Sequence, residues 1–275
     1  MITSVSNEKV KHIVQLRDKA RLREEEGVFL VEGVRLFREV PKDRVEECYV
    51  TEHGVELLGF VPEGAEMVAD AVMAKMSDVK TPQGVLALVR RREYTWEDLL
   101  QNEAPLLLMA EDLQDPGNLG TIFRTAEAAG VDGIILSKGC ADVYQPKVVR
   151  STMGAVLRLP FLTVDAIPDC FEKLNKSGVT VYAAALTDTA VPYIQQDYTK
   201  GCAFLIGNEG NGLQASTVSA AEAAGEVVII PMAGATESLN ASVSAAVLLY
   251  EAARQRGFST KKCNRSIDYY HRFGA

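Results

Sequence analysis

The second half of the chain alternates short, near-continuous apolar runs with longer segments of helical spacing. The apolar runs are LLLMA (106–110), GIIL (133–136), VTVYAAA (179–185), CAFLIG (202–207) and EVVIIP (226–231). Strands buried on both faces of a parallel sheet have this composition, because helices cover both sides of the sheet. Helices are expected between and after the runs, at 119–129, 145–153, 166–177, 212–223 and 239–256. The alternation predicts a doubly wound α/β domain.

A smaller α/β unit is expected to precede this domain. Residues 5–25 place apolar side chains among basic ones at near-helical spacing and predict a basic amphipathic helix. The next segment, GVFLVEGVRLFREV, predicts a strand at 27–31 and a helix from about Gly33, and further strands are predicted at 45–52, 66–70 and 84–90, with a helix near 71–78. The charged segment RRREYTWEDLLQNEAP then indicates a linker. We therefore predict two domains, 1–96 and 97–275.

Composition argues against several classes of protein. No apolar run approaches the roughly 20 residues that span a bilayer. The N-terminus lacks the apolar stretch of a secretory signal. The cysteines (Cys48, Cys140, Cys170, Cys202 and Cys263) are odd in number and never in CxxC spacing, which disfavours a disulfide framework and structural zinc. These features predict a cytoplasmic protein without membrane association.

Charge is unevenly distributed along the chain. The net charge of −8 argues against a uniformly cationic nucleic-acid binder, but basic residues gather within 1–23 and within 254–275. Such patches on an acidic body can still bind phosphates, because screening confines each charge to about 10 Å. Solvated, helix-rich termini are the alternative. The sequence leaves that choice open, and with it the role of the basic tail 257–275.

Three polar turns follow predicted strands, at the edge where open α/β sheets bind ligands. In the first, EDLQDPGNLGTIFRTAEAAG, Asn118 could simply cap the helix. Arg124 interrupts the apolar helix that follows, either for function or as an arginine that snorkels to solvent.

The second and third turns raise the same question. In LIGNEGNGL, the glycines around Glu209 imply closely approached backbone, although the spacing matches neither the dinucleotide fingerprint nor the phosphate loop. A plain glycine-rich loop is the alternative. In the third turn, Thr236, Glu237, Ser238 and Asn240 crowd together, whereas a helix cap needs only one such residue. Three turns at strand ends, each with more polar side chains than a simple connection needs, favour a functional site.

At these positions the chain resembles the SpoU (TrmH) family of RNA ribose 2′-O-methyltransferases. NLGTIFRTAEAAG, IGNEGNGL and IPMAGATESLNASVSAAVLLYEA resemble the three successive motifs of that family in order and spacing. The segment ADVYQPKVVRSTMGAVLRLPF (141–161) resembles the one between the first two motifs. The resemblance covers about residues 105–256. Residues 1–92 are similar to the ribosomal-protein-like α/β domain with which family members bind RNA substrates.

The resemblance implies a trefoil-knotted SPOUT methyltransferase domain whose knot binds S-adenosylmethionine mainly through backbone groups. It implies a homodimer in which the first-motif arginine reaches the cofactor of the partner subunit. The positions that match cofactor contacts are Gly207, Ile230 and Leu239. Those that match catalytic-region residues are Asn118, Arg124, Glu209, Ser238 and Asn240.

The implied reaction is methylation of a ribose 2′-hydroxyl, with large-subunit ribosomal RNA as the favoured substrate and transfer RNA as the alternative. It requires the hydroxyl to be deprotonated or polarised and aligned with the methyl group, for which no metal is needed. The sequence offers no metal-ligand cluster. The family proposal makes Arg124 the base, but a guanidinium normally stays charged, so binding phosphate and stabilising alkoxide charge is equally open. A non-catalytic RNA-binding assembly factor is the rival function. An oxidoreductase would need the glycine fingerprint that is missing.

Overall fold

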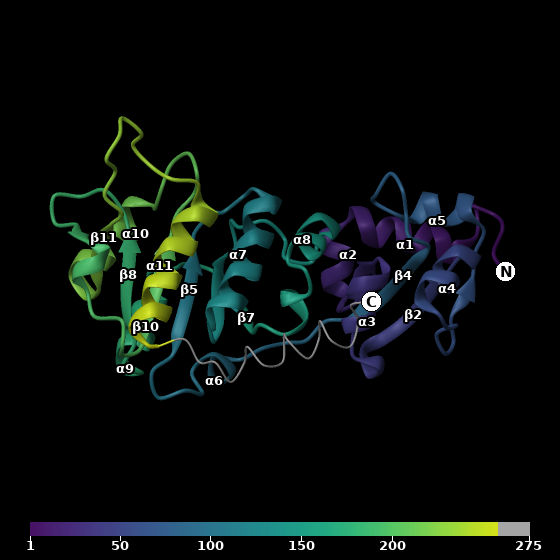
Figure 1. Cartoon of the computed structure of the whole chain (residues 1–275), viewed down its shortest axis with the longest axis horizontal. Helices are drawn as coiled ribbons and strands as arrows, with labels where there is room; N and C mark the ends of the chain where they lie inside the picture. Colours follow the sequence, from purple (N-terminus) through teal and green to yellow (C-terminus); the bar gives the residue numbers. More distant parts are fainter. Residues whose placement is uncertain (258–275) are drawn as a thin grey trace.

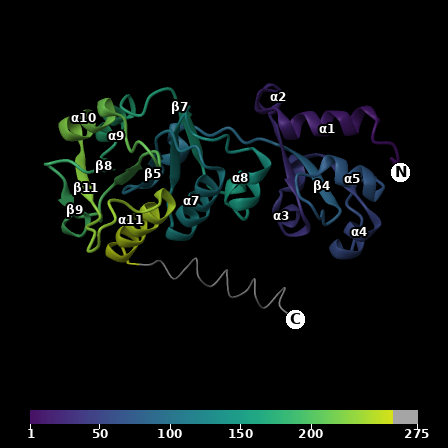
Figure 2. The ribbon, with the colours of Figure 1, turned by 90° about the horizontal axis from the view of Figure 1, so that it is seen from above.

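The computed structural model describes residues 1–257, which form two β-sheets placed side by side along the long axis of the molecule (Figures 1 and 2). Cys263 and the rest of the basic tail beyond residue 257 lie outside the described residues. No helix within residues 1–257 is long and apolar enough to cross a membrane.

The first sheet has the strand order β1-β4-β2-β3, with β1 (Val28–Glu32), β4 (Val85–Arg90) and β2 (Val45–Val50) antiparallel and β3 (Glu66–Met67) parallel to β2. Its helices are α1 (Glu8–Asp18), α2 (Ala20–Glu25), α3 (Val34–Glu39), α4 (Glu52–Leu58) and α5 (Asp70–Met76). The single helix predicted over residues 5–25 is wrong, because Lys19 is extended (φ −117°, ψ 107°) and separates α1 from α2. The Arg23 guanidinium donates to the carbonyls of Leu16 and Arg17 and so satisfies the end of α1.

The second sheet confirms the predicted doubly wound α/β domain. Every pairing in it is parallel, in the order β7-β6-β5-β10-β8-β11-β9. The five predicted runs form β5 (Leu106–Ala110), β6 (Gly133–Ser137), β8 (Thr180–Ala184), β10 (Cys202–Ile206) and β11 (Glu226–Ile229). The edge strands β7 (Phe161–Val164) and β9 (Val191–Pro192) were not predicted, because edge strands are only partly buried and need no continuous apolar run.

Helices cover both faces of the second sheet, as its buried strands require. On one face α7 (Pro116–Ala129), α8 (Pro146–Ser151) and α11 (Ala241–Gln255) share a core, and on the other lie α9 (Cys170–Lys176) and α10 (Ala215–Ala224). Figure 1 shows α11 and α7 next to each other in front of the sheet, and residues of the two helices are in contact.

The segment predicted as a linker is packed rather than free. The Tyr94 side chain is buried, and its ring lies 5.8 Å from that of Phe161. The short helix α6 (Trp96–Leu99) follows, capped by Thr95 and Asp98 in a reciprocal capping box. Leu99 is fully buried against the second sheet. The connection therefore belongs to the folded body.

Candidate active site

The first two polar turns start side by side because β5 and β10 are neighbours in register. Ala110 at the end of β5 pairs with Ile206 at the end of β10, and the Glu111 amide donates to the Ile206 carbonyl at 2.9 Å. The chain leaves β11 through the third turn and returns as α11, which packs against both α7 and β10. The three turns thus meet at the carboxyl edge of the sheet.

Asn118 connects all three turns. It does not cap α7: the cap is Asp115, whose carboxylate accepts from the Asn118 amide N–H at 2.7 Å. The Asn118 side chain is therefore available, and its Nδ2 donates to Glu209 Oε1 at 2.7 Å. Its Oδ1 accepts from Asn240 Nδ2 at 3.0 Å. The hydrogen-bonded chain Asn240–Asn118–Glu209 joins one residue from each turn.

The Asn240 side chain both caps α11 and bonds to Asn118. Its Oδ1 caps α11 by accepting from the Ser242 backbone N–H at 3.0 Å and from the Ser242 hydroxyl at 2.6 Å. Because the amide oxygen is occupied by the cap, the Nδ2 group is oriented towards Asn118. Asn240 is thus the one residue of the third turn that caps α11, and the cap fixes the side chain that reaches across to the first turn.

Arg124 and Ser238 are not part of this set of hydrogen-bonded side chains. Arg124 lies on the exposed side of α7, opposite buried residues such as Phe123, and makes no hydrogen bond or ion pair within residues 1–257. Ser238 is likewise exposed, with no hydrogen-bond partner in the described part of the chain. Both side chains remain available to a ligand.

The glycine loop is a tight turn that presents Glu209. The backbones of Asn208 and Gly212 exchange two hydrogen bonds of 2.9 Å, and Asn208 Oδ1 accepts from the Gly210 amide at 2.8 Å. A Cβ on the buried Gly207 would lie 2.3 Å from the Gly212 carbonyl carbon, so the turn closes only over glycine. Gly212 has φ +67°, which also favours glycine.

Two acidic residues that the sequence analysis did not single out hold this loop. Glu111 is 2% exposed and accepts from the Gln214 amide at 2.7 Å and the Thr217 hydroxyl at 2.6 Å, which fixes the start of α10. Asp112 has φ +53°, and its carbonyl accepts from Asn208 Nδ2 at 2.8 Å. The available signal was an acidic pair placed directly after a wholly buried strand.

The segment 231–239 offers a binding surface made of backbone. Within residues 1–257 none of its backbone groups has a hydrogen-bond partner, and its residues are exposed except for Met232 and Leu239, which are half-buried. Ile230 and Leu239 contribute apolar surface at its two ends. In the second turn, Gly212 has no neighbouring atom where a side chain would lie. A ligand held mainly by backbone groups, as S-adenosylmethionine is expected to be, fits these residues.

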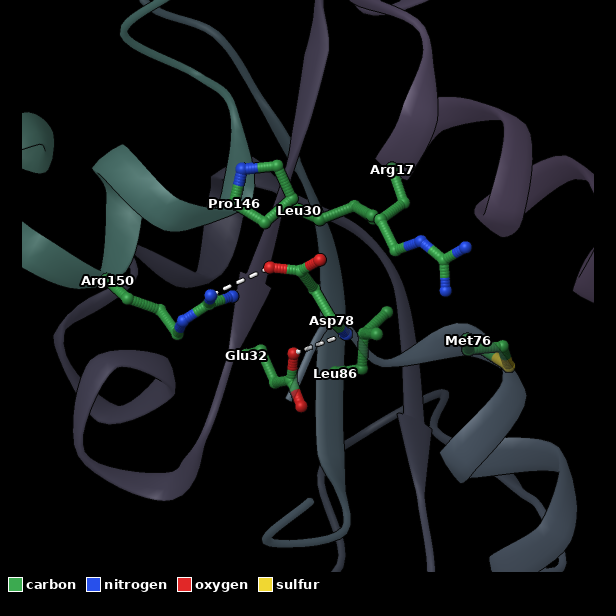
Figure 3. Close-up of a pocket in the computed structure, with 8 residues that line it drawn as sticks. All are labelled: Arg17, Leu30, Glu32, Met76, Asp78, Leu86, Pro146 and Arg150. Carbon is green, nitrogen blue, oxygen red and sulfur yellow. Dashed lines mark hydrogen bonds and ion pairs between the residues drawn. The ribbon is translucent and has the colours of Figure 1, made fainter. Parts of the chain in front are cut away.

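A separate hollow lies between the first sheet and α8 (Figure 3). None of the predicted site residues line it. In it Arg150 Nη2 pairs with Asp78 at 2.7 Å and Arg17 donates to the Lys75 and Ser77 carbonyls, while Arg150 Nη1 is buried without a hydrogen-bond partner in the described residues. The hollow lies at the contact between the first sheet and α8.

Two family models match the chain. Residues 105–250 match the model of the SpoU rRNA Methylase family, and residues 7–87 match that of the MRM3-like substrate binding domain. The second match shows that a substrate-binding domain is present ahead of the methylase domain.

Similar curated proteins cover nearly the whole chain. The 23S rRNA (guanosine(2553)-2′-O)-methyltransferase RlmP of Bacillus subtilis is 33% identical over 90% of this chain and 97% of its own length. An uncharacterised tRNA/rRNA methyltransferase of Synechocystis is 34% identical over 93% of this chain and 94% of its own. The human mitochondrial rRNA methyltransferase 3 is 27% identical, over 90% of this chain and 72% of its own length.

Solved structures match the fold equally well. The AdoMet-bound rRNA methyltransferase from Sinorhizobium meliloti superposes with a TM-score of 0.80 at 31% identity, covering 92% of this chain and 97% of that one. The SpoU methyltransferase AviRb from Streptomyces viridochromogenes, in complex with AdoMet, gives a TM-score of 0.79 at 29% identity, covering 91% and 98%. With its three motifs joined at one sheet edge and these likenesses over almost its full length, the chain belongs to the SpoU rRNA methylase family.

Proposed function

We propose that the chain methylates a ribose 2′-hydroxyl of large-subunit ribosomal RNA at the Asn118 site. The observation that carries the proposal is the hydrogen-bonded chain Asn240–Asn118–Glu209, which joins the three motif turns beside the backbone surface of residues 231–239. The similarity to the 23S rRNA 2′-O-methyltransferase of Bacillus subtilis supports the choice of substrate.

As a SpoU methyltransferase, the protein uses S-adenosylmethionine, and its SPOUT fold implies the C-terminal trefoil knot. When bound, the cofactor supplies an activated methyl group. Gly207, Ile230 and Leu239 are our candidates for holding it. Gly207 would do so by letting the loop close tightly, and Ile230 and Leu239 by apolar contact at either end of the exposed segment.

The chain of amides gives the acceptor hydroxyl a fixed surrounding. Asn118 is restrained on both sides, by Glu209 and by Asn240, so its amide does not reorganise when substrate binds. Ser238 lies exposed two residues before Asn240 and is our candidate for orienting the hydroxyl.

Arg124 is the residue that we assign to the reacting oxygen. Its exposure and lack of a partner within residues 1–257 leave the guanidinium free to bind the neighbouring phosphate and to stabilise alkoxide charge. A role as base is the alternative. Arg124→Ala is expected to reduce methyl transfer by orders of magnitude without changing cofactor affinity. Rescue by Arg124→Lys with a shifted pH–rate profile would favour a role of Arg124 as the base. No rescue would favour binding of phosphate and alkoxide charge by the planar guanidinium.

We also propose a division of labour at the boundary 96/97, with residues 1–96 selecting the RNA and 97–275 performing the transfer. The match of residues 7–87 to a substrate-binding domain supports this division. The basic side chains of α1 and α2 do not form an unpaired cationic patch, because Lys9, Lys11, Arg17, Arg21 and Arg23 are all paired with carboxylates. The pairs of Lys9, Lys11 and Arg21 are exposed and therefore weak, so RNA phosphates can replace their carboxylates, whereas Arg23 is buried.

A homodimer that acts in the cytoplasm completes the proposal. The apolar Val243 is 46% exposed on α11, next to α7, and would be covered by a second copy in a dimer that brings Arg124 to the partner's cofactor. Light scattering across a concentration series tests the dimer. A monomer at the concentrations where the enzyme is active would contradict it.

The deciding experiment is mass-spectrometric mapping of ribose methylation in cellular RNA with and without the gene. We expect one 2′-O-methyl group to disappear from large-subunit ribosomal RNA and to return with the wild-type gene but not with Arg124→Ala. Loss of a transfer RNA mark instead would reassign the substrate. No lost mark, together with no calorimetric binding of S-adenosylmethionine, would favour a non-catalytic assembly factor.

A further inference from the structure

One of the clusters of buried apolar residues extends across both sheets. Phe29 and Val31 of β1 and Val89 of β4 belong to the same contiguous cluster of buried residues as Tyr144 and Val149 of the second sheet's helical layer. The rings of Phe29 and Tyr144 lie 4.7 Å apart. Domains linked by small polar interfaces move relative to one another by default, whereas a shared hydrophobic core opposes such motion.

Polar bonds across the same interface fix its geometry. Arg23 is 3% exposed, and its Nη2 pairs with Asp142 Oδ2 at 2.5 Å while its Nη1 is held by backbone carbonyls of α1. Arg150 of α8 pairs with Asp78 at 2.7 Å across the hollow of Figure 3. A third contact places the Arg91 guanidinium 4.3 Å from the centre of the Tyr144 ring.

One further bond reaches the helix that carries the candidate catalytic arginine. Arg158 Nη2 donates to Glu127 Oε2 at 2.9 Å, and its Nη1 pairs with Glu39 of α3 in the first unit. Glu127 lies on α7, three residues after Arg124. The Arg158–Glu39 pair passes close to Gly154. There φ is +93° and a Cβ would lie 2.2 Å from Glu39 Oε2, so this position needs glycine.

We infer that the N-terminal unit is held in one fixed orientation relative to the second unit. We also infer that Arg158 is a positioning residue for the choice of nucleotide. The shared core holds the unit in one orientation, and Arg158 ties that orientation to α7 and hence to Arg124. The nucleotide that is methylated is then the one at a fixed offset from the RNA contacts of the first unit. The inference rests on the proposed function in this last step only.

Spin-label distances on the full chain test the rigidity without any assay of activity. Ala74→Cys on α5 and Ala223→Cys on α10 are exposed helical positions, one in each unit, and Cys263→Ser removes a thiol that lies outside the described residues. We expect one narrow distance distribution that does not change when 23S rRNA is added. A broad distance distribution, or a shift of its maximum when RNA is added, would overturn the inference that the N-terminal unit has a fixed orientation.

Arg158→Gln tests the positioning role, and Arg90→Gln is its matched control, because Arg90 pairs with Glu46 inside the first unit. We expect Arg158→Gln to broaden the distance distribution and lower methylation at the native nucleotide by at most about fivefold, the upper end of the effect of one partly exposed ion pair. Methyl groups should also appear on neighbouring nucleotides, while calorimetric affinity for S-adenosylmethionine stays unchanged.

The outcomes separate the two proposals. If Arg158→Gln leaves both the distance distribution and the methylated nucleotide unchanged, or if Arg90→Gln changes them equally, Arg158 is not a positioning residue. If the wild-type protein methylates no ribosomal RNA, the proposed function fails. The inference that the methylated nucleotide lies at a fixed offset from the RNA contacts of the first unit then fails with it. The rigid connection between the two units is then still decided by the spin-label distances alone.

Discussion

Replacing Gly120 with alanine tests how tightly α7, the helix that carries Asn118 and Arg124, is positioned. Gly120 lies where α7 crosses α8, and a Cβ there would lie 2.2 Å from Ser151 Cβ and 3.1 Å from the Val148 carbonyl oxygen. Non-bonded carbons are attracted most strongly at about 3.5–4.0 Å, so the two helices have to move apart by more than about 1 Å.

The expected loss of activity exceeds the expected loss of stability. Overpacking of this kind costs about 1–3 kcal/mol. Alanine recovers about 1 kcal/mol of that through its higher helix propensity. The displacement of α7 moves Asn118 and Arg124 together, and a misplacement of about 1 Å can reduce a rate by about 100-fold. Gly120→Ala should therefore remain folded, with a slightly lower Tm, and transfer methyl groups about 100-fold more slowly.

Single-turnover methyl transfer to 23S rRNA, with calorimetry for cofactor affinity, measures this effect. The double variant Gly120→Ala/Ser151→Gly removes the atom that the new methyl group meets, leaving contacts of 3.1 and 3.2 Å that small adjustments relieve. It should recover most of the rate. Ala128→Ser, at an exposed position of the same helix, is the control. A wild-type rate for Gly120→Ala, or no recovery in the double variant, would refute the reasoning.

Asn118→Asp should slow methyl transfer more than Asn118→Ala, because it places a second carboxylate opposite Glu209; equal single-turnover rates would contradict this. Hydrogen bonding from Arg254 lowers the pKa of Glu251 from 4.5 to about 2, so the stability that this carboxylate contributes is present above pH 4.5 and is lost as the pH falls to about 2. Glu251→Gln should therefore cost about 1 kcal/mol or less near pH 7 and nothing near pH 2, which thermal melts at both pH values check. Burial raises the pKa of Cys202 to about 11, so a thiol reagent near pH 8 should modify it only after unfolding, as peptide mass spectrometry would show.

Much of the fold was predictable because burial leaves a direct mark on sequence. Each of the five apolar runs of the second half is a central strand, since helices cover both sides and exclude polar side chains. The break at Lys19 was not predictable, because helical spacing continues through it, whereas in the structure the Arg23 guanidinium satisfies the carbonyls at the end of α1.

The candidate site was predictable as a set of residues but not as an arrangement. The crowding of polar groups after strand ends pointed to Asn118, Glu209 and Asn240, yet Asn118 could equally have been a cap. Only the structure shows that Asp115 takes the cap and leaves the Asn118 amide to join the other two turns. The acidic pair after a buried strand was the available signal for Glu111, but its role was not predictable, because its partners Gln214 and Thr217 lie 103 and 106 residues away.

The sequence by itself determined the parallel sheet, the polar edge and the family, because these depend on local composition and short motifs. Tertiary structure alone decided that the two units share one core and that Arg158 ties the first unit to the helix of Arg124. An apolar residue such as Phe29 is equally compatible with the core of its own sheet and with a core between sheets. The choice depends on which surfaces meet, and contacts between residues far apart in the chain are set by packing and not by spacing.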